Sequence, residues 1–237
     1  MLLLGIETAT RRVGVALGSD EGMLGIVEVG GATGAGPPRH AEQLAPAIDF
    51  LCREVGVSLR SVSAVAVGIG PGMFTGLRVG VTTAKTLGMA LSVPLVPVPS
   101  LDLLAYPLRH ATHELVVPMI YARRHEVYYA IYQPVPGGTQ RVSEYSPATP
   151  EQIVAEISAR GQHALCCGDG AMRFSSSFGG RDLVELAGPA HSRPDLGALL
   201  ELAGARFARE EFVGANDVAP LYLRKSDAEL DADRRAS

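Results

Sequence analysis

Tryptophan is absent from this 237-residue chain, and aromatic residues make up only 5% of it. Cysteine is almost as scarce: Cys52, Cys166 and Cys167 are the three present, and no two of them have the CxxC spacing of zinc or redox motifs. Successive side chains of a strand point to opposite faces of its sheet, so Cys166 and Cys167 cannot share one zinc ion. We therefore expect reduced thiols, as is usual in the cytosol.

Long apolar runs and a strong charge of either sign are missing as well. No apolar run approaches the roughly 20 residues of a membrane span, and Met1 leads straight into a predicted strand without the basic start of a signal peptide. The net charge of −4 argues against a large non-specific surface for nucleic acid, although it leaves room for local basic patches. With 47% hydrophobic and 19% charged residues, we expect a globular cytoplasmic protein with no membrane partner.

The most informative segment is 67–85, with the sequence VGIGPGMFTGLRVGVTTAK. An alternating apolar run ends at Gly70-Pro71-Gly72, and a helical pattern then continues through Leu91. This arrangement predicts a tight turn from a strand into a helix. Such a turn directs backbone N–H groups and the positive end of a helix at whatever lies in front of it, for example a phosphate.

The helix after this turn carries small residues along one face. Gly76, Gly80, Ala84 and Gly88 recur every four residues, which places them on one side of the helix. Each interior glycine destabilises a helix by about 1 kcal/mol relative to alanine, so another backbone must come close to this stripe. That backbone belongs either to the chain's own lobe or to a second protein. An exposed position for the adjacent Met-Phe pair at 73–74 would favour a second protein.

The order of predicted elements suggests a duplicated α/β unit. The first half contains strands at 2–7, 13–17, 24–29, 62–69 and 94–98, with helices at 40–55 and up to 91. The second half contains strands at 115–120, 126–132, 140–145, 164–168 and 183–186, with helices at 150–160 and 195–209. We therefore predict lobes at 1–110 and 111–224 and a charged tail at 225–237. A ligand would bind in the cleft between the lobes.

Five segments of the chain carry a specific resemblance. They are the N-terminal IETAT, RHAEQLAP at 39–46, GIGPGMFTGLRVGVTTAKTLGMAL at 68–91, VPLVPVPSLDLLA at 93–105 and PLYLR at 220–224. Together they resemble the TsaB (YeaZ) family, bacterial proteins that take part in making threonylcarbamoyladenosine on tRNA. The resemblance covers nearly the whole chain. It implies the two-lobed actin/hexokinase/Hsp70-like (ASKHA, ribonuclease H-like) fold.

The resemblance also implies partners. TsaD, a paralogue, is expected to carry the catalytic site and to form a heterodimer with this chain, and TsaE joins them in an ATP-dependent ternary complex. That complex transfers threonylcarbamoyl from threonylcarbamoyl-AMP to N6 of adenosine 37 in tRNAs that read ANN codons. We expect ATP and metal on the partner subunits, no tightly bound cofactor on this chain, and tRNA bound through the complex. A homodimer is expected when the partner is missing.

Two positions indicate that this chain is not the catalyst. TsaD-type sequences resemble IPLIGVNHLEGH after the glycine-rich helix, and the two histidines there bind the metal. Ser100 and Leu104 take those positions here. Serine is a weak metal ligand and leucine is none, so the metal site cannot form, and Ser100 is better suited to cap a helix. We predict a non-catalytic subunit without catalytic or metal-binding residues, which binds and activates TsaD.

The predicted partner contacts lie on helix 40–55 and on the glycine-rich turn and helix. They are His40, Gln43, Leu44, Gly72, Met73, Phe74, Thr75, Gly76, Arg78, Gly80, Ala84 and Gly88. We expect Gly76→Leu or Gly80→Leu to weaken partner binding while leaving the isolated chain folded.

The alternative interpretation is an enzyme that acts alone, an ASKHA-type ATPase or small-molecule kinase. Such an enzyme needs an acidic residue near position 121 or an equivalent ligand elsewhere, and the turn 121–125 reads YARRH, without a carboxylate or glycine. The candidates for weak nucleotide or anion contacts are Glu7, Thr8, Thr10, Arg123 and Arg124. Arg78 and Lys85, together with the two arginines at 123–124, are also candidates for contact with tRNA, although ordinary surface charge is the simpler interpretation.

Two further site types receive little support. His110 and His113 have a spacing that a helix could turn to metal binding, but a solvated junction between the lobes is the simpler interpretation. No GxSxG motif is present, and no Ser/His/Asp set stands out by its spacing, which argues against a protease.

Overall fold

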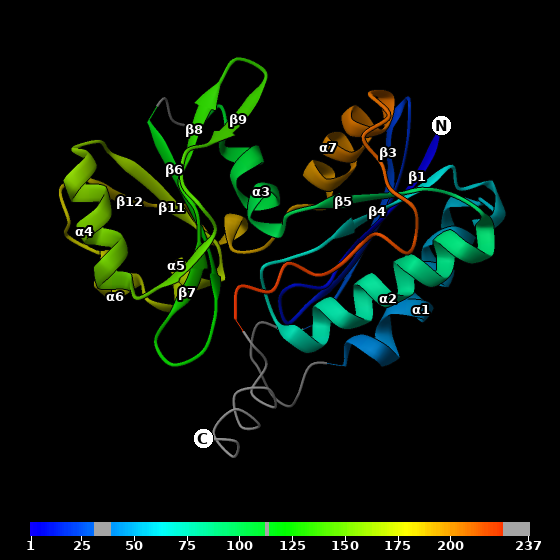
Figure 1. The fold of residues 1–237 in the computed structure, drawn as a ribbon, viewed down its shortest axis with the longest axis horizontal. Coiled ribbons are helices and arrows are strands. Elements are labelled where there is room, and N and C mark those ends of the chain that lie inside the picture. The colour runs from blue at the N-terminus through cyan, green and yellow to red at the C-terminus, as the bar shows by residue number, and fades with distance from the viewer. Residues whose placement is uncertain (31–38, 112–113, 225–237) are drawn as a thin grey trace.

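The computed structural model describes residues 1–30, 39–111 and 114–224. Two lobes lie side by side, each built on a β-sheet with helices packed against it (Figure 1). Within those ranges, no helix is both long and apolar enough to cross a membrane. The predicted charged tail, 225–237, lies outside the described residues.

The first lobe is a five-stranded sheet in the order β3-β2-β1-β4-β5. Its strands are β1 (Leu2–Glu7), β2 (Val13–Ser19), β3 (Gly22–Val29), β4 (Ala64–Gly68) and β5 (Leu95–Val98). The first three pair antiparallel, whereas β4 and β5 run parallel to β1. Parallel neighbours need a crossover, and the helices α1 (His40–Val55) and α2 (Phe74–Leu91) lie in the connections before and after β4.

Helices α1 and α2 lie next to each other on one face of this sheet (Figure 1). Helix α1 buries Leu44, Ile48 and Leu51, which recur at helical spacing, and it ends at Gly56 with a left-handed φ of 74°. Helix α2 is 18 residues long and ends at Leu91, where its periodicity predicts. The side of each helix away from the sheet is left at the molecular surface.

The second lobe has a seven-stranded sheet whose main path is β10-β7-β6-β11-β12. Its strands are β6 (Leu115–Tyr121), β7 (Val127–Tyr129), β8 (Tyr132–Val135), β9 (Gly138–Arg141), β10 (Ser146–Ala148), β11 (Ala164–Cys167) and β12 (Val184–Leu186). Its helices are α4 (Pro150–Arg160), α5 (Asp169–Arg173) and α6 (Ser175–Phe178). Helix α3 (Ser100–Ala105) lies between the lobes, and short 3-10 turns occupy Leu59–Ser61, Tyr106–Leu108 and Pro189–His191.

The same connectivity recurs in both lobes. Strand β1 pairs antiparallel with β2 and parallel with β4, and β6 pairs antiparallel with β7 and parallel with β11. A further parallel strand, β5 or β12, follows on the outer side of each. This repetition confirms the predicted duplicated α/β architecture.

The predicted strand 126–132 is divided into β7 and β8. The break lies at Ile131, whose N–H donates to Ser143 Oγ at 2.8 Å and whose carbonyl accepts from the N–H of Val142 at 2.8 Å. Because Ile131 bonds to this loop, β8 turns away and forms a separate hairpin with β9. Of the predicted strand 140–145, only residues 140–141 form strand, at the end of β9, because residues 142–145 form the loop that binds Ile131 and β10 starts at Ser146.

The last helix belongs to the first lobe, which corrects the expected extent of the second lobe, 111–224. Helix α7 (Leu196–Ala208) packs on the first sheet, on the face opposite α1 and α2. Three leucines of α7 lie over three glycines of the β1–β2 hairpin: Leu199 over Gly5, Leu196 over Gly14 and Leu200 over Gly18. A Cβ at any of these glycines would come within 3.1 Å of a leucine methyl group, so the glycines make room for the helix.

The C-terminal segment, residues 213–224, then follows α2 back towards the second lobe. Val213 and Leu95 exchange two backbone hydrogen bonds of 2.9 Å, and Lys85 Nζ donates to the carbonyl of Val218 at 3.1 Å. Further along, the N–H of Leu221 donates to the carbonyl of Ile69 at 2.7 Å. Lys85, a candidate for contact with tRNA, is therefore engaged within the chain.

A partly buried polar cluster joins the lobes at α3. Asp102 Oδ1 accepts from the hydroxyl groups of Tyr132 at 2.6 Å and Tyr145 at 2.8 Å. On the other side, Arg206 of α7 lies 3.5 Å from Asp102 Oδ2 and donates to the carbonyl of Pro97 at 2.6 Å. Burial raises the pKa of both tyrosines, so these hydroxyl groups stay protonated and act as donors.

All three cysteines are free and buried. Burial raises the pKa of Cys166 to about 12 and also raises that of Cys167, so neither is a thiolate at neutral pH. These side chains pack the interior.

Candidate partner-binding site

The glycine-rich turn between β4 and α2 forms its polar contacts within the chain. The N–H of Met73 donates to the carbonyl of Ala9 at 2.7 Å, and a Cβ at Gly72 would overlap that carbonyl. Gly70, with φ of 96°, accepts from the N–H of Ser100 at 2.7 Å and donates to its Oγ at 3.2 Å. The turn therefore faces the β1–β2 hairpin rather than an open phosphate site.

The small-residue stripe of α2 also packs within the lobe. Thr8 Oγ1 donates to the carbonyl of Gly76 at 2.9 Å, and a Cβ at Gly80 would overlap the same Oγ1. Ala84 is fully buried, and a Cβ at Gly88 would lie 2.9 Å from Leu95 Cδ2. Of the two alternatives for the stripe, the structure supports packing within the lobe. The expectation that these four residues touch a partner directly is corrected, because the β1–β2 hairpin and β5 already occupy that side.

Two predicted contacts on α1 are buried as well. His40 Nε2 lies 2.8 Å from the carbonyl of Thr10, and the imidazole fills the space beside Gly76. Leu44 belongs to the core of the first lobe. Gln43 is half-buried and keeps a surface position.

The outer side of the same two helices is exposed. On α2 the exposed residues are Thr75, Arg78, Thr82, Thr86, Met89 and Ala90, and on the middle of α1 they are Ala45, Pro46, Asp49 and Phe50. We call this surface the α1–α2 face. Phe50 is 49% exposed and Met89 is 58% exposed, so this face presents two large apolar side chains to solvent. Sequence reasoning missed both, although each lies off the apolar stripe of its helix.

The start of α2 carries an aromatic cluster. The Phe74 ring lies 4.9 Å from the ring of Tyr222, between centroids, and the Arg78 guanidinium lies 5.2 Å from the centroid of Phe74. Tyr222 belongs to the C-terminal segment, which therefore covers part of Phe74 and leaves that ring half-buried. Met73 is also half-buried.

The three candidate anion contacts of the first hairpin face inwards. Glu7 Oε1 accepts from the N–H of Ala9 at 2.5 Å, and its Oε2 accepts from Ser100 Oγ at 2.8 Å. Burial raises the pKa of Glu7, although these hydrogen bonds oppose the shift. Thr8 is fully buried, and Thr10 Oγ1 accepts from the N–H of Arg12 at 3.4 Å. All three side chains are therefore buried and are not available to a nucleotide or anion in solvent.

Ser100 and Leu104, at the expected metal positions, are both buried. Ser100 is the first residue of α3 rather than its N-cap, because its hydroxyl bridges Glu7 and Gly70. Leu104 packs in the apolar cluster between α3 and the second sheet. Within the described ranges, no three His, Cys, Asp or Glu side chains gather into a metal site. Of the candidate metal pair, His110 is exposed and His113 lies outside those ranges.

An acidic residue that sequence reasoning missed lies beside the second-lobe hairpin. Asp169, in the Gly-Asp-Gly turn after β11, accepts from the N–H of Tyr121 at 2.8 Å. Burial raises its pKa to about 6 against the opposing effect of the backbone hydrogen bonds. The turn sequence was a signal for it. Its carboxylate is bonded to the backbone, so it anchors the hairpin.

Arg123 and Arg124 are exposed at the tip of this hairpin. Arg124 and His125 have φ angles of 57° and 64°, a left-handed conformation that costs of order 1–3 kcal/mol for each residue other than glycine. Glycine and asparagine are the residues that adopt this conformation most readily.

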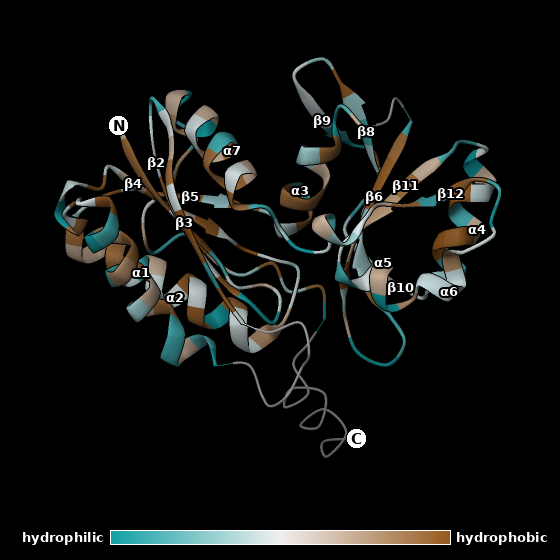
Figure 2. Cartoon of the chain, turned by 180° about the vertical axis from the view of Figure 1, so that it is seen from behind, coloured by the Kyte–Doolittle hydropathy of each residue, from teal (hydrophilic) through white to brown (hydrophobic). Residues whose placement is uncertain are grey.

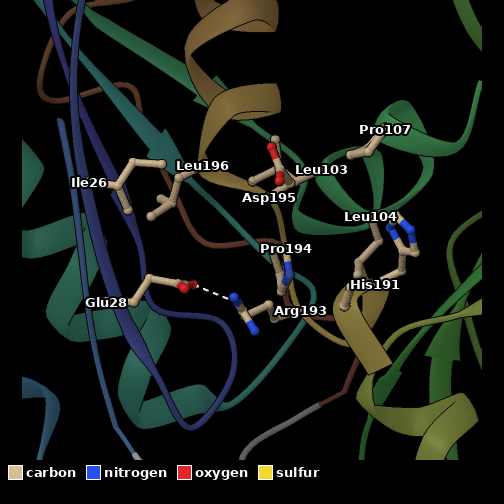
Figure 3. A pocket seen from close by; sticks show the side chains of 11 residues that line it. Ile26, Glu28, Leu103, Leu104, Pro107, His191, Arg193, Pro194, Asp195 and Leu196 are labelled. Atoms are coloured by element: carbon tan, nitrogen blue, oxygen red, sulfur yellow. Dashed lines mark ion pairs between the residues drawn. The ribbon is translucent and has the colours of Figure 1, made fainter. Parts of the chain in front are cut away.

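A separate pocket of about 130 Å³ lies at the junction between the lobes, and Figure 3 shows it from close by. It is lined by residues of β3, α3 and the segment 190–196. Across it, Arg193 Nε lies 2.9 Å from Glu28 Oε1. None of the predicted site residues lines this pocket.

Comparisons with known proteins agree with these features. A family model described as "TsaD: tRNA N6-adenosine threonylcarbamoyltransferase" matches residues 36–231. The chain is 29% identical to the tRNA threonylcarbamoyladenosine biosynthesis protein TsaB of Haemophilus influenzae over 94% of both chains, and 29% identical to that of Escherichia coli over 96% of both. Among solved structures, YeaZ from Pseudomonas aeruginosa is 31% identical, with a TM-score of 0.79 over 94% of this chain and 99% of that chain. This chain belongs to the TsaB/YeaZ family.

The match with YeaZ extends over both lobes and supports the expected ASKHA fold. TsaB relatives are named for tRNA threonylcarbamoyladenosine biosynthesis, and that pathway is therefore the setting for this chain. The match to the TsaD family model places TsaD-like proteins and this TsaB/YeaZ chain in one wider family.

Proposed function

We propose that this chain is a non-catalytic subunit that binds TsaD through its α1–α2 face and activates it. The complex, with TsaE and ATP, transfers threonylcarbamoyl from threonylcarbamoyl-AMP to N6 of adenosine 37 in tRNAs that read ANN codons. The observation that carries this proposal is the contrast between large apolar side chains on the outside of α1 and α2 and the internal bonding of the cleft residues.

The composition of the α1–α2 face suits a protein partner. Phenylalanine, methionine and arginine are enriched at interfaces, and this face presents Phe50, Met89 and Arg78. The Phe74–Tyr222 pair holds its rings in place before binding, which lowers the entropic cost of association. The small-residue stripe has an indirect part: it lets α2 lie close to the β1–β2 hairpin, so that the outer side of the helix is rigid.

A non-catalytic role is supported by the positions of Ser100 and Leu104. Both are used in packing, one through the Glu7 network and the other through an apolar cluster. We assign ATP and metal to the partner subunits. A subunit without a reactive centre accelerates the reaction by binding the productive arrangement of TsaD more tightly than other arrangements.

The same face also suits a second copy of this chain. A two-fold contact would bury the α1–α2 face of each copy, and TsaD would then compete with the homodimer for one surface.

The test is a double variant, Phe50→Ala with Met89→Ala. We expect TsaD binding, measured by calorimetric titration, to weaken at least tenfold, while the thermal midpoint of the isolated chain changes little because both side chains are exposed. The matched control is Met23→Ala with Leu24→Ala, which removes two exposed apolar side chains from β3. Wild-type affinity in the folded α1–α2 variant would refute this docking face.

A second measurement separates the proposal from the stand-alone ATPase or kinase. The purified chain should neither hydrolyse ATP nor transfer threonylcarbamoyl until TsaD and TsaE are added. Asp169 is an acidic residue beside position 121, and its carboxylate is bonded to the N–H of Tyr121. Robust activity of the chain alone would overturn the scaffold role.

A further inference from the structure

The hairpin between β6 and β7 presents positive charge on a rigid support. Arg123 and Arg124 are exposed at its tip, and Arg173 at the end of α5 lies beside its base. The Arg173 guanidinium is 4.2 Å from the centroid of Tyr121, the last residue of β6. We call these three arginines and His125 the hairpin basic surface.

Aromatic rings hold two of the four residues of the hairpin basic surface, His125 and Arg173, in place. The His125 ring meets the Phe174 ring edge-on at 4.7 Å between centroids, and Phe174 also lies 6.1 Å from Tyr121. Arg173 is fixed over Tyr121 by a cation–π contact. Cations that are already ordered lose little conformational entropy when they bind an anion.

Of the carboxylates around this surface, two are engaged elsewhere in the chain, whereas Glu151 is exposed beside His125. Glu126 forms an ion pair with Arg224, and Glu151 lies 3.5 Å from His125. Asp169 is buried and accepts from the N–H of Tyr121. Among the described residues here, three exposed arginines therefore stand against one exposed carboxylate, although the chain as a whole carries −4.

The backbone of the tip points to a role for its side chains. Arg124 and His125 are both left-handed, with φ of 57° and 64°, where asparagine and glycine are the residues that relieve strain. A long cation at such a position weakens the turn without adding a core contact. The side chain, rather than the turn, explains why arginine is there.

We propose that the hairpin basic surface binds the phosphate backbone of tRNA while the α1–α2 face holds the protein partner. Guanidinium groups bind phosphate oxygens through paired hydrogen bonds, and an extended polyanion can engage several arginines at once. This inference rests on the proposed function, because the substrate of the complex is the RNA in question. The α1–α2 face and the hairpin lie on different lobes, so the two contacts are separable by mutation (Figure 1).

The first test is Arg123→Gln with Arg124→Gln in the complex of this chain with TsaD, TsaE and ATP. The probe is an unmodified transcript of an ANN-reading tRNA, titrated by fluorescence anisotropy at several salt concentrations. We expect affinity to fall about tenfold and the slope of log K against log salt to become shallower by roughly 1 to 2, since each lost phosphate contact removes about 0.7–0.9. The matched control, Arg60→Gln with Arg181→Gln, removes the same charge from two other exposed positions.

The second test replaces Arg124-His125 by Asn-Gly. Because Asn-Gly suits left-handed backbone, the thermal midpoint should stay the same or rise while tRNA affinity falls. TsaD affinity should be unchanged in both hairpin variants, which separates this proposal from the α1–α2 docking face. Equal losses in the hairpin and control variants would mean that only net charge matters and would overturn the proposal. A loss of TsaD affinity with unchanged tRNA affinity would assign the hairpin to protein contact and would also overturn it.

Discussion

Each lobe has a corner where a strand, a glycine turn and a hairpin meet, and the two lobes place an acidic residue there from different segments. In each, a central parallel strand ends in a glycine turn that packs against the hairpin of its own lobe. In the first lobe the hairpin supplies the acid: Glu7 lies against Gly68, where a Cβ would overlap its carboxyl group. In the second lobe the turn supplies the acid, and Asp169 binds the N–H of Tyr121 in the hairpin. The same corner therefore takes its carboxylate from the hairpin in one lobe and from the turn in the other.

The helices that follow these turns differ more than the turns do. Helix α2 has 18 residues and covers its hairpin, whereas α5 has five residues and leaves the hairpin tip exposed. In the first lobe, α2 therefore covers the hairpin on its inner side and leaves a long helical surface on its outer side. The second lobe offers a short basic loop. Figure 2 shows the same contrast from behind, with α1 and α2 running along the first lobe while α5 and α6 stay small.

The largest expected effect on stability comes from Gly80→Ala, which disrupts the packing of α2 against the β1–β2 hairpin. The new methyl group would overlap Thr8 Oγ1 and displace a buried hydroxyl that donates to Gly76. Overpacking costs about 1–3 kcal/mol, and loss of a buried hydrogen bond adds about 1–3 kcal/mol, whereas alanine regains about 1 kcal/mol of helix propensity. We expect a net loss of about 3 kcal/mol in the free energy of unfolding, measured by urea denaturation.

Ala90→Leu, which adds bulk at an exposed position of the same helix, is the control and should change stability little. This expectation replaces the earlier one that Gly76→Leu or Gly80→Leu leaves the chain folded. If Gly80→Ala is as stable as the wild type, the β1–β2 hairpin does not pack closely against α2.

Local patterns predicted the helices of the first lobe well. The expected ends of α1 at 40 and 55, and of α2 at 91, agree with the structure because periodicity and the left-handed cap at Gly56 are local properties. The occupant of the stripe was not predictable from such patterns. Thr8 and Gly80 are far apart in the sequence, and a stripe of small residues indicates that something comes close without identifying it.

Long-range packing also explains the other differences. Leu199 lies over Gly5, so α7 returns to the first lobe, but no pattern within 196–208 names its sheet. Asp169 was visible as part of a turn, and its carboxylate became informative only once Tyr121 was placed beside it.

A second prediction concerns Asp169, the acidic residue of the second lobe, and the pH dependence of the free energy of unfolding. The folded pKa of Asp169 is raised from 3.8 to about 6, so the folded state keeps a proton that the unfolded chain releases. This group therefore stabilises the fold fully below pH 3.8, and its contribution is lost as pH rises through 6. A shift of about two units corresponds to roughly 2–3 kcal/mol.

Asp169→Asn cannot titrate, and it retains an oxygen that accepts from the N–H of Tyr121. We expect the variant to gain roughly 2–3 kcal/mol relative to wild type between pH 4 and pH 7.5, measured from urea midpoints at both values. Asp182→Asn, at an exposed position of the same lobe, is the control. A pH-independent difference between wild type and Asp169→Asn would show that Asp169 is not buried as a proton-holding group.

The smallest expected effect concerns the one ion pair described here that joins the C-terminal segment to the second-lobe hairpin. Arg224 pairs with Glu126, and both side chains are partly exposed, at 36% and 22%. Ion pairs of this kind contribute up to about 1 kcal/mol, so Arg224→Gln should change the unfolding free energy by less than that. The effect should instead be local: hydrogen exchange at the N–H of Leu221, which is bonded to Ile69, should become faster because the segment loses its anchor. Arg209→Gln breaks an exposed pair with Glu211 within the first lobe and should leave that amide unchanged. If exchange at the N–H of Leu221 is equally slow in both variants, contacts with the first lobe alone hold the C-terminal segment. The second-lobe hairpin is then independent of the first lobe.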